Sequence, residues 1–205
     1  MDQARLALHR SLGGAVWAAG DCDAAVAARF ERVVPDLLPG AGPLSGIVAA
    51  LDAAADRRGE GDKDAAARPG SAPPGADRAA NVSDRPLDAA SIVVLSGDLP
   101  FVTAGCVERL VAAAAAAPEA DAVVAVAAEP RDENAPNPAS AAAPRFEPCV
   151  ALYRPSAAGV LRPALVAGRT PSLQSLLARL RVAPVALDAA LLRGANRPED
   201  LRGTS

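Results

Sequence analysis

The sequence predicts an α/β fold in which a largely parallel sheet is covered by helices on both faces. Short apolar runs alternate along the chain with segments of helical pattern, which is the order expected of βαβ units. The apolar runs end at glycine, proline or aspartate, the residues that close strands and begin turns. A chain of 205 residues has the length of a single domain, residues 1–205, with a sizeable core.

The first part of the chain alternates helical and extended patterns. Apolar residues spaced for one helix face predict a short helix over 3–12, and the apolar run 15–19 predicts a buried strand. Asp21 or Asp23 can cap a helix over 22–30, because a carboxylate accepts hydrogen bonds from the free amides of a first turn. A short strand over 32–34 and a helix over 44–55 complete this part.

The remaining elements continue the alternation. The run Ile92-Val93-Val94-Leu95 predicts a buried strand, and the helix over 103–117 that follows it ends at Pro118. Further strands are expected over 122–128, 149–153 and 182–187, and further helices over 157–167 and 172–180. A final helical turn begins with Pro198 at its first position.

Two segments have the periodicity of neither a helix nor a strand. Residues 56–89 are rich in Gly, Pro, Ala, Asp and Arg, and residues 129–144 are rich in Pro, Asn and Ala. Such segments bury too little apolar surface to offset the chain entropy that folding removes. We therefore expect two disordered insertions within the single domain.

Composition excludes several classes of function. The net charge of −3 supplies no basic surface, so nucleic acid is not an expected partner. The three cysteines lack metal-ligand spacing, and their odd number fits a reducing compartment. His9 is the only histidine, which excludes a multi-histidine metal site. With no signal peptide and no membrane-spanning run, we expect a cytoplasmic protein without membrane contact.

The segment Ser96-Gly97-Asp98-Leu99-Pro100-Phe101 carries the first candidate site residue. It follows the strand 92–95 directly, so Asp98 is expected at the carboxyl edge of the sheet, where open α/β sheets bind their ligands. A carboxylate there can hold a divalent cation against phosphate oxygens. The alternative is that Asp98 caps the following helix or accepts a hydrogen bond from a loop amide.

A second candidate site is the glycine-rich loop before the helix 44–55. Glycines 40, 42 and 46 allow backbone amides to approach a ligand at the helix N-terminus. The loop matches neither the dinucleotide-binding fingerprint nor the phosphate-loop motif. A plain strand-to-helix connection would explain the same residues.

Three segments taken in order resemble the molybdenum cofactor guanylyltransferases, which are nucleotidyltransferases of three-layer, Rossmann-like fold. They are Val33-Val34-Pro35-Asp36 with Gly42-Pro43-Leu44-Ser45-Gly46, then Ser96-Gly97-Asp98-Leu99-Pro100-Phe101, and last Asn196-Arg197-Pro198-Glu199-Asp200-Leu201. The strand Pro148-Cys149-Val150-Ala151-Leu152-Tyr153-Arg154 is also similar to that family. The resemblance covers nearly all of the chain outside the two insertions.

The resemblance implies a Mg²⁺-dependent enzyme that transfers GMP from GTP to Mo-molybdopterin and releases pyrophosphate. Asp98 matches the catalytic aspartate that holds Mg²⁺ and the nucleotide phosphates. Asp36 matches an acidic residue of the guanine site, and Gly42, Pro43, Leu44 and Gly46 match the nucleotide-binding loop beside it. Asn196 matches an asparagine on the acceptor side.

The chain departs from the family at its N-terminus. Family members open with a strand ending in Leu-Ala-Gly-Gly and then an Arg-Met-Gly-x-Asp-Lys run, whose loop wraps the triphosphate. Nothing here matches that loop, since Gly13-Gly14 precedes a strand, and Lys63 lies in the first insertion. Relative to the family the chain is N-terminally truncated, so we expect open apolar strand edges and self-association.

Three hypotheses about function follow from the sequence. The first is a guanylyltransferase whose true start lies upstream of Met1. The second is a catalytically impaired relic or a nucleotide-binding subunit that retains Asp36 and Asp98. The third is a nucleotidyltransferase that uses another acceptor, such as a sugar phosphate or a phospho-lactate.

Overall fold

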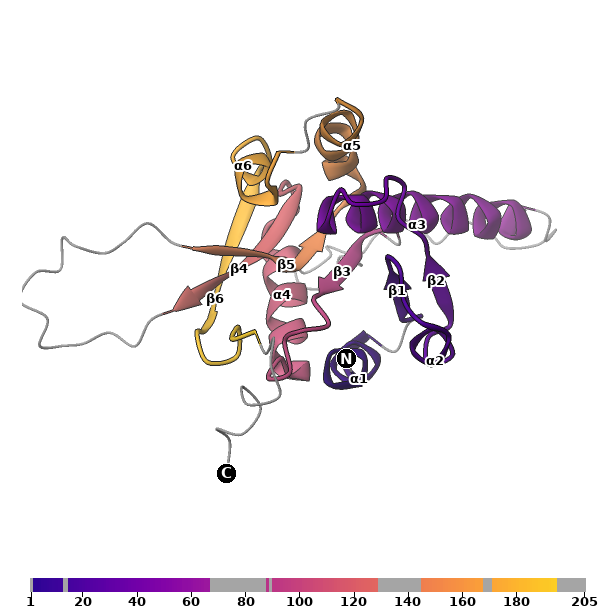
Figure 1. Ribbon diagram of the computed structural model, residues 1–205. Coiled ribbons are helices and arrows are strands. Elements are labelled where there is room, and N and C mark those ends of the chain that lie inside the picture. Colours follow the sequence, from indigo (N-terminus) through magenta and orange to yellow (C-terminus); the bar gives the residue numbers. More distant parts are fainter. Residues whose placement is uncertain are drawn as a thin grey trace, which may run out of the picture.

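The computed structural model describes residues 2–12, 15–66, 88, 90–128, 145–167 and 171–194, and confirms the α/β class (Figure 1). Its helices are α1 (Asp2–Leu12), α2 (Ala24–Ala27), α3 (Pro43–Ala66), α4 (Ala104–Ala116), the 3-10 turn η3 (Pro155–Ala157), α5 (Ala158–Val166) and α6 (Leu173–Leu177). Its strands are β1 (Trp17–Ala19), β2 (Arg32–Val34), β3 (Ile92–Leu95), β4 (Ala122–Ala128), β5 (Phe146–Tyr153) and β6 (Val182–Asp188). No helix in these ranges is both long and apolar enough to cross a membrane.

The strands form two sheets that share no backbone pairing in the described part of the chain. β1 and β2 pair in parallel, and a four-stranded sheet has the order β3-β5-β4-β6. β6 is parallel to β4, whereas β5 is antiparallel to both β3 and β4. The strands β3, β4 and β6 therefore run in one direction, as the largely parallel prediction expected, and within this sheet only β5 runs against them. The helices α5 and α6 lie between β5 and β6 and supply the crossover that the parallel β4–β6 pairing requires.

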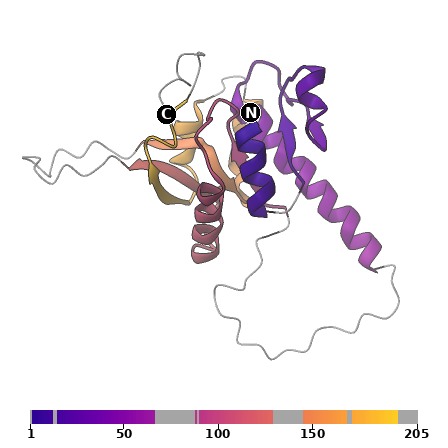
Figure 2. The ribbon, with the colours of Figure 1, turned by 90° about the horizontal axis from the view of Figure 1, so that it is seen from below.

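Helices cover both faces of the four-stranded sheet, which confirms the predicted three layers (Figures 1 and 2). On one face, α3, α5 and α6 bury a cluster that includes Leu44, Leu161 and Leu176. On the other face, α4 packs Leu110 and Ala114 against the sheet. The helix α1 lies beside α4, and the Ser11 hydroxyl donates to the Ala104 carbonyl at 3.0 Å.

Burial differs sharply between the strands of this sheet. The residues of β4 from Ala122 to Ala125 and of β5 from Val150 to Tyr153 have no exposed surface. The four residues of β3 are equally apolar, yet each is only partly buried. Because β3 pairs with β5 alone among the described strands, its second edge is open.

The helices α2 and α3 differ in length from the prediction. None of the side chains of α2 is buried, so this helix is a single turn held by the Asp23 cap, whose Oδ1 accepts from the Val26 amide at 2.8 Å. The helix α3 continues to Ala66, so residues 56–66 are helical although the sequence predicted a disordered insertion from residue 56. Extension of a helix that is already nucleated needs only one further hydrogen bond for each residue added, so this segment is helical although it contains two glycines and three aspartates.

Several predicted segments lie outside the described residues. They are Gly13-Gly14, most of the first predicted insertion, all of the insertion 129–144, and the helical turn that begins at Pro198.

Asp121 holds the beginnings of β4 and β6 together. Its Oδ2 accepts from the Arg181 backbone amide at 3.0 Å and from Arg181 Nε at 3.1 Å, and its Oδ1 accepts from the Ser156 hydroxyl at 2.6 Å. The hydrogen bonds from the Arg181 side chain hold the pKa of the Asp121 carboxyl well below its usual range, although burial acts in the opposite direction. The ionised carboxylate therefore joins β4, β6 and η3.

We expect Asp121→Asn to weaken the acid dependence of stability. Because the folded pKa is depressed, the wild-type carboxylate stabilises the fold above its unfolded pKa of about 4, and this contribution is lost as the pH falls toward the lower folded pKa. At pH 7 the variant should lose about 1–2 kcal/mol, a modest value because the pair is partly exposed to solvent. Urea unfolding at pH 7 and pH 3 measures both effects. Ser156→Ala should weaken the pH dependence less than Asp121→Asn does, because Arg181 and not Ser156 makes the largest contribution to the depressed pKa of Asp121. An unchanged dependence in Asp121→Asn would contradict the assignment.

We also expect the chain to self-associate through its open strand edges. The edges of β1 and β3 that lack a partner among the described strands present unpaired amides and carbonyls, which template pairing with other chains. Sedimentation velocity over a dilution series should show an average mass that rises with concentration. Ala18→Lys on β1 should reduce the association, whereas Ala167→Lys, on the exposed turn after α5, should not. A single monomeric species at all concentrations would refute this expectation.

Candidate functional site

The turn after β3 holds the Asp98 carboxylate at the end of the sheet. The Ser96 amide donates to the Cys149 carbonyl at 2.9 Å, which extends the β3–β5 pairing by one residue. The side chain of Leu99 is buried among the residues that pack against α4, while Asp98 is exposed. The Ser96 hydroxyl donates to Asp98 Oδ1 at 2.5 Å and so orients the carboxylate. The alternative in which Asp98 caps the following helix is wrong, because Thr103 occupies the N-cap of α4.

Asp36 lies just after β2, where the ends of three elements converge. A Cβ atom at Gly20, after β1, would lie 3.7 Å from Asp36 Oδ2, and one at Gly46, in the first turn of α3, would lie 3.4 Å from Asp36 Oδ1. Gly20 also has a φ of +94°, which an L side chain rarely adopts. The absence of side chains at these two glycines therefore lets the backbone after β1 and the first turn of α3 lie close to the carboxylate.

Ser45 fixes the loop that connects β2 to α3. It is completely buried in the first turn of the helix, and its hydroxyl accepts a hydrogen bond from the Leu38 amide at 2.8 Å. The sequence analysis assigned no role to this residue. The signal in the sequence was a hydroxyl side chain within the glycine-rich loop, a common position for capping and loop-fixing contacts.

The predicted nucleotide-binding loop divides into exposed and buried residues. Gly42, with a φ of +66°, and Pro43 are exposed at the start of α3. The side chain of Leu44 is 1% exposed and belongs to the main hydrophobic core, so only its backbone can reach a ligand. Gly46 is buried beside Asp36.

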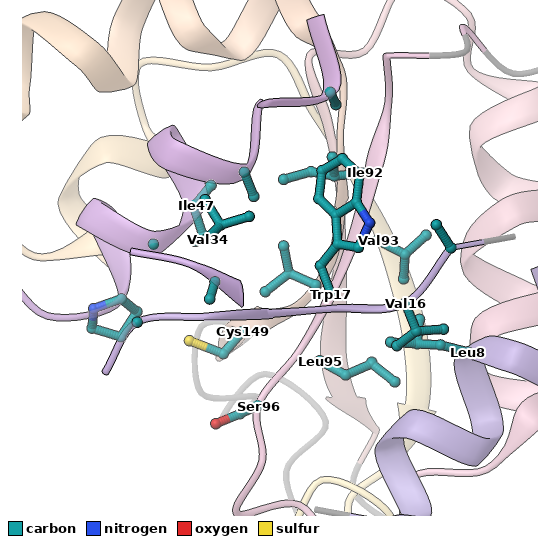
Figure 3. A pocket seen from close by; sticks show the side chains of 18 of the residues that line it. Leu8, Val16, Trp17, Val34, Ile47, Ile92, Val93, Leu95, Ser96 and Cys149 are labelled. Carbon is teal, nitrogen blue, oxygen red and sulfur yellow. The ribbon is translucent and has the colours of Figure 1, made fainter. Parts of the chain in front are cut away.

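A cavity of about 950 Å³ connects the two candidate sites (Figure 3). Asp36, Gly42, Pro43 and Gly46 line it from one side, and Ser96 and Gly97 line it from the other. The structure therefore brings together the loop after β2 and the turn after β3, which are far apart in the sequence. Asp98 directly follows this lining.

Cys149 also lines the cavity, near Ser96 (Figure 3). Burial raises the pKa of its thiol, and the negative charges of Asp98 and Glu147 raise it further. A protonated thiol is a poor nucleophile, so this cysteine has the character of a lining residue. Cys22, Cys106 and Cys149 are all free.

The exposed Asp98 carboxylate fits one kind of metal site. The described residues contain no group of three or more His, Cys, Asp or Glu side chains that could enclose an ion. In nucleotide sites, Mg²⁺ is usually held by one or two carboxylates together with phosphate oxygens and waters. A single carboxylate at the end of a strand suits that arrangement and does not suit an all-protein cage.

Asn196 lies outside the described residues, but the chain leading to it reaches Asp98. A Cβ atom at Gly194 would lie 3.9 Å from the carbonyl oxygen of Asp98 and 3.9 Å from its Oδ2. The sequence analysis did not single out Gly194. Only the fold shows that the segment after β6 returns to the turn after β3.

The chain was compared with known families and solved structures. The MobA-like NTP transferase domain matches residues 5–185. Molybdopterin-guanine dinucleotide biosynthesis protein A from Archaeoglobus fulgidus is similar in structure, with a TM-score of 0.52, 22% identity, and coverage of 87% of this chain and 69% of that one. A protein from Aquifex aeolicus has a TM-score of 0.51, 14% identity, and coverage of 85% and 68%.

A third similarity is weaker and supports no conclusion. It is to 2-C-methyl-D-erythritol 4-phosphate cytidylyltransferase from Thermus thermophilus, with a TM-score of 0.42, 20% identity, and coverage of 87% of this chain and 82% of that one. No curated protein matches the chain. Since the family match spans far more than half of the sequence, the chain belongs to the MobA-like NTP transferase domain family and is a nucleotidyltransferase of that type.

Proposed function

We propose that this nucleotidyltransferase transfers GMP from GTP to Mo-molybdopterin and releases pyrophosphate. The observation that carries the proposal is that one cavity is lined by the Asp36 loop, the first turn of α3 and the turn that precedes Asp98. The solved structure from Archaeoglobus fulgidus, which is similar in fold, is named for molybdopterin-guanine dinucleotide biosynthesis. All reactants are small and polar, so we place the reaction in the cytoplasm.

In this proposal Asp36 binds the guanine base. The pairing edge of guanine presents two neighbouring N–H donors, and one ionised carboxylate can accept both. Adenine offers an acceptor at the corresponding ring nitrogen, so it would face the carboxylate unfavourably. Because Gly20 and Gly46 carry no side chain, neither of them covers the Asp36 carboxylate.

Asp98 is proposed to act at the phosphates, with its orientation set by Ser96. Asp98 would hold Mg²⁺ here. When bound, this ion would neutralise negative charge on the phosphate oxygens of the nucleotide. An oxygen of the acceptor attacks the α-phosphorus, the bond from that phosphorus to the bridging oxygen of the β-phosphate breaks, and pyrophosphate leaves. We place the acceptor on the side of Gly194, from which the chain continues to Asn196.

A second candidate function is nucleotide binding without turnover. Among the described residues, the cations that line the cavity are Arg57 and Arg58, which follow Gly46 by about 16–18 Å along α3. They are therefore poorly placed to neutralise charge beside Asp98. Release of pyrophosphate from GTP in the presence of Mo-molybdopterin distinguishes the two functions, and parallel assays with a sugar phosphate or a phospho-lactate test other acceptors.

We expect Asp98→Ala to weaken GTP binding in the presence of Mg²⁺ by about 10- to 100-fold, or about 1.4–2.8 kcal/mol, because it removes the proposed metal ligand. Titration calorimetry with Mg²⁺ and with excess EDTA measures the difference. Asp188→Ala is the matched control, since Asp188 also lies at a strand end and accepts from the Ala190 amide at 2.9 Å. An equal loss in both variants, or a loss that persists in EDTA, would contradict the proposed role.

We expect Asp36→Asn to reduce the preference for GTP over ATP by at least about tenfold. The substitution preserves the size of the side chain but replaces one acceptor oxygen with a donor amide, which opposes a guanine N–H. Competition between the two nucleotides at equal Mg²⁺ measures the preference, with Asp52→Asn on α3 as the control. A GTP preference that survives the change would remove Asp36 from the base site.

A further inference from the structure

The loop between β2 and α3, residues 35–42, carries Asp36 but is weakly anchored by its own side chains near that residue. Leu37 and Leu38 are 52% and 44% exposed, so neither side chain holds the loop against the core. Ala41 packs against the main core, at the end of the loop that joins α3. The Asp36 end of the loop therefore needs another anchor.

The hydroxyl of Ser45 supplies this anchor. Ser45 is completely buried in the first turn of α3, and its Oγ accepts a hydrogen bond from the Leu38 amide at 2.8 Å. Leu38 follows Asp36 by only two residues. The first turn of the helix holds the acceptor oxygen in place, so the bond fixes the loop backbone relative to α3.

The same turn of α3 also lies against the Asp36 carboxylate. A Cβ atom at Gly46, the residue after Ser45, would lie 3.4 Å from Asp36 Oδ1. The turn that accepts a hydrogen bond from the loop is therefore also in contact with the side chain that the loop presents. A shift of the loop relative to this turn would move the carboxylate within the site.

Recognition of guanine by one carboxylate depends strongly on the orientation of that carboxylate. The base presents its ring N–H and its amino group side by side, and each carboxylate oxygen can accept from one of them. Two parallel hydrogen bonds require the carboxylate to lie near the plane of the base, whereas a single bond forms over a wider range of angles. The position of the loop backbone therefore decides whether both bonds form.

We propose that Ser45 is a positioning residue for guanine recognition. Through the Leu38 amide, it holds the loop so that the Asp36 carboxylate accepts both hydrogen bonds from the base. This inference rests on the proposed function, in which Asp36 binds guanine. Ser45 is completely buried, so it acts through the loop backbone and does not touch the nucleotide.

The first measurement needs no nucleotide. Amide hydrogen exchange at Leu38, followed by NMR, reports on its hydrogen bond to Ser45. We expect Ser45→Ala to speed this exchange at least about tenfold, because the acceptor is removed. Ser172→Ala is the matched control: the Ser172 hydroxyl, at the start of α6, accepts from the Ser175 amide at 3.2 Å, and its loss should leave exchange at Leu38 unchanged.

The second measurement compares the binding of GTP and inosine triphosphate, which keeps the ring N–H of guanine but lacks the amino group. The wild-type chain should bind GTP at least about tenfold more tightly, and Ser45→Ala should reduce this preference to about threefold or less. Ser172→Ala should retain the wild-type preference. Thermal unfolding followed by circular dichroism verifies that each variant is folded.

Two conservative variants examine the hydroxyl itself. Ser45→Thr keeps the acceptor oxygen and should restore both the slow exchange at Leu38 and the preference for GTP. Ser45→Cys has nearly the size of serine but a weaker acceptor, so its preference should lie between those of the wild type and Ser45→Ala. The cysteine variant keeps the series informative if the added methyl group of threonine disturbs the buried site.

The outcomes separate this inference from the proposed function. A wild-type chain without a preference for GTP would refute the proposed base site, and the role of Ser45 would fall with it. A wild-type preference that survives in Ser45→Ala, with fast exchange at Leu38, would overturn the role of Ser45 alone. An equal loss of preference in Ser172→Ala would also overturn it, because the effect would then follow from stability and not from the loop.

Discussion

The packing of α3 against both sheets is the constraint on which the rest of the structure depends. Ala49 and Ala53 pack against Val34 of the two-stranded sheet, while Leu44 and Val48 pack into the core of the four-stranded sheet. Each large apolar side chain buried in this way contributes about 1.5–3 kcal/mol. Because the two sheets share no backbone pairing in the described residues, this helix sets the position of the β2 end relative to the β3 end. The geometry of the candidate site therefore depends on side-chain packing.

The cavity that results has two chemically different ends. At one end, the carboxylate of Asp36 and the turn that carries Asp98 offer the polar groups that a nucleotide and its metal require. At the other end, the free edges of β1 and β3 meet apolar side chains of α1 and α3. The polar end supports the proposed nucleotidyl transfer.

Local sequence patterns were sufficient to predict most of the elements. The apolar runs of β2 and β3 and the capping role of Asp23 have the predicted positions, because propensity and capping act over a few residues. The length of α3 was not predictable from the sequence, since its last eleven residues, 56–66, have no apolar face and contain two glycines and three aspartates, which disfavour a helix. The antiparallel direction of β5 was not specified by the sequence, because alternation of elements does not determine which neighbours a strand selects.

For the candidate site, the sequence by itself determined the residue types and their order: Asp36, the glycines of the loop, and Asp98 after a buried strand. Only the tertiary structure decided that the Asp36 loop and the turn after β3 line one cavity, that Leu44 belongs to the core, and that Gly194 lies beside Asp98. It also decided that β1 and β3 border this cavity. These relations depend on pairing and packing between residues that are distant in the chain, and local propensity carries no information about such contacts.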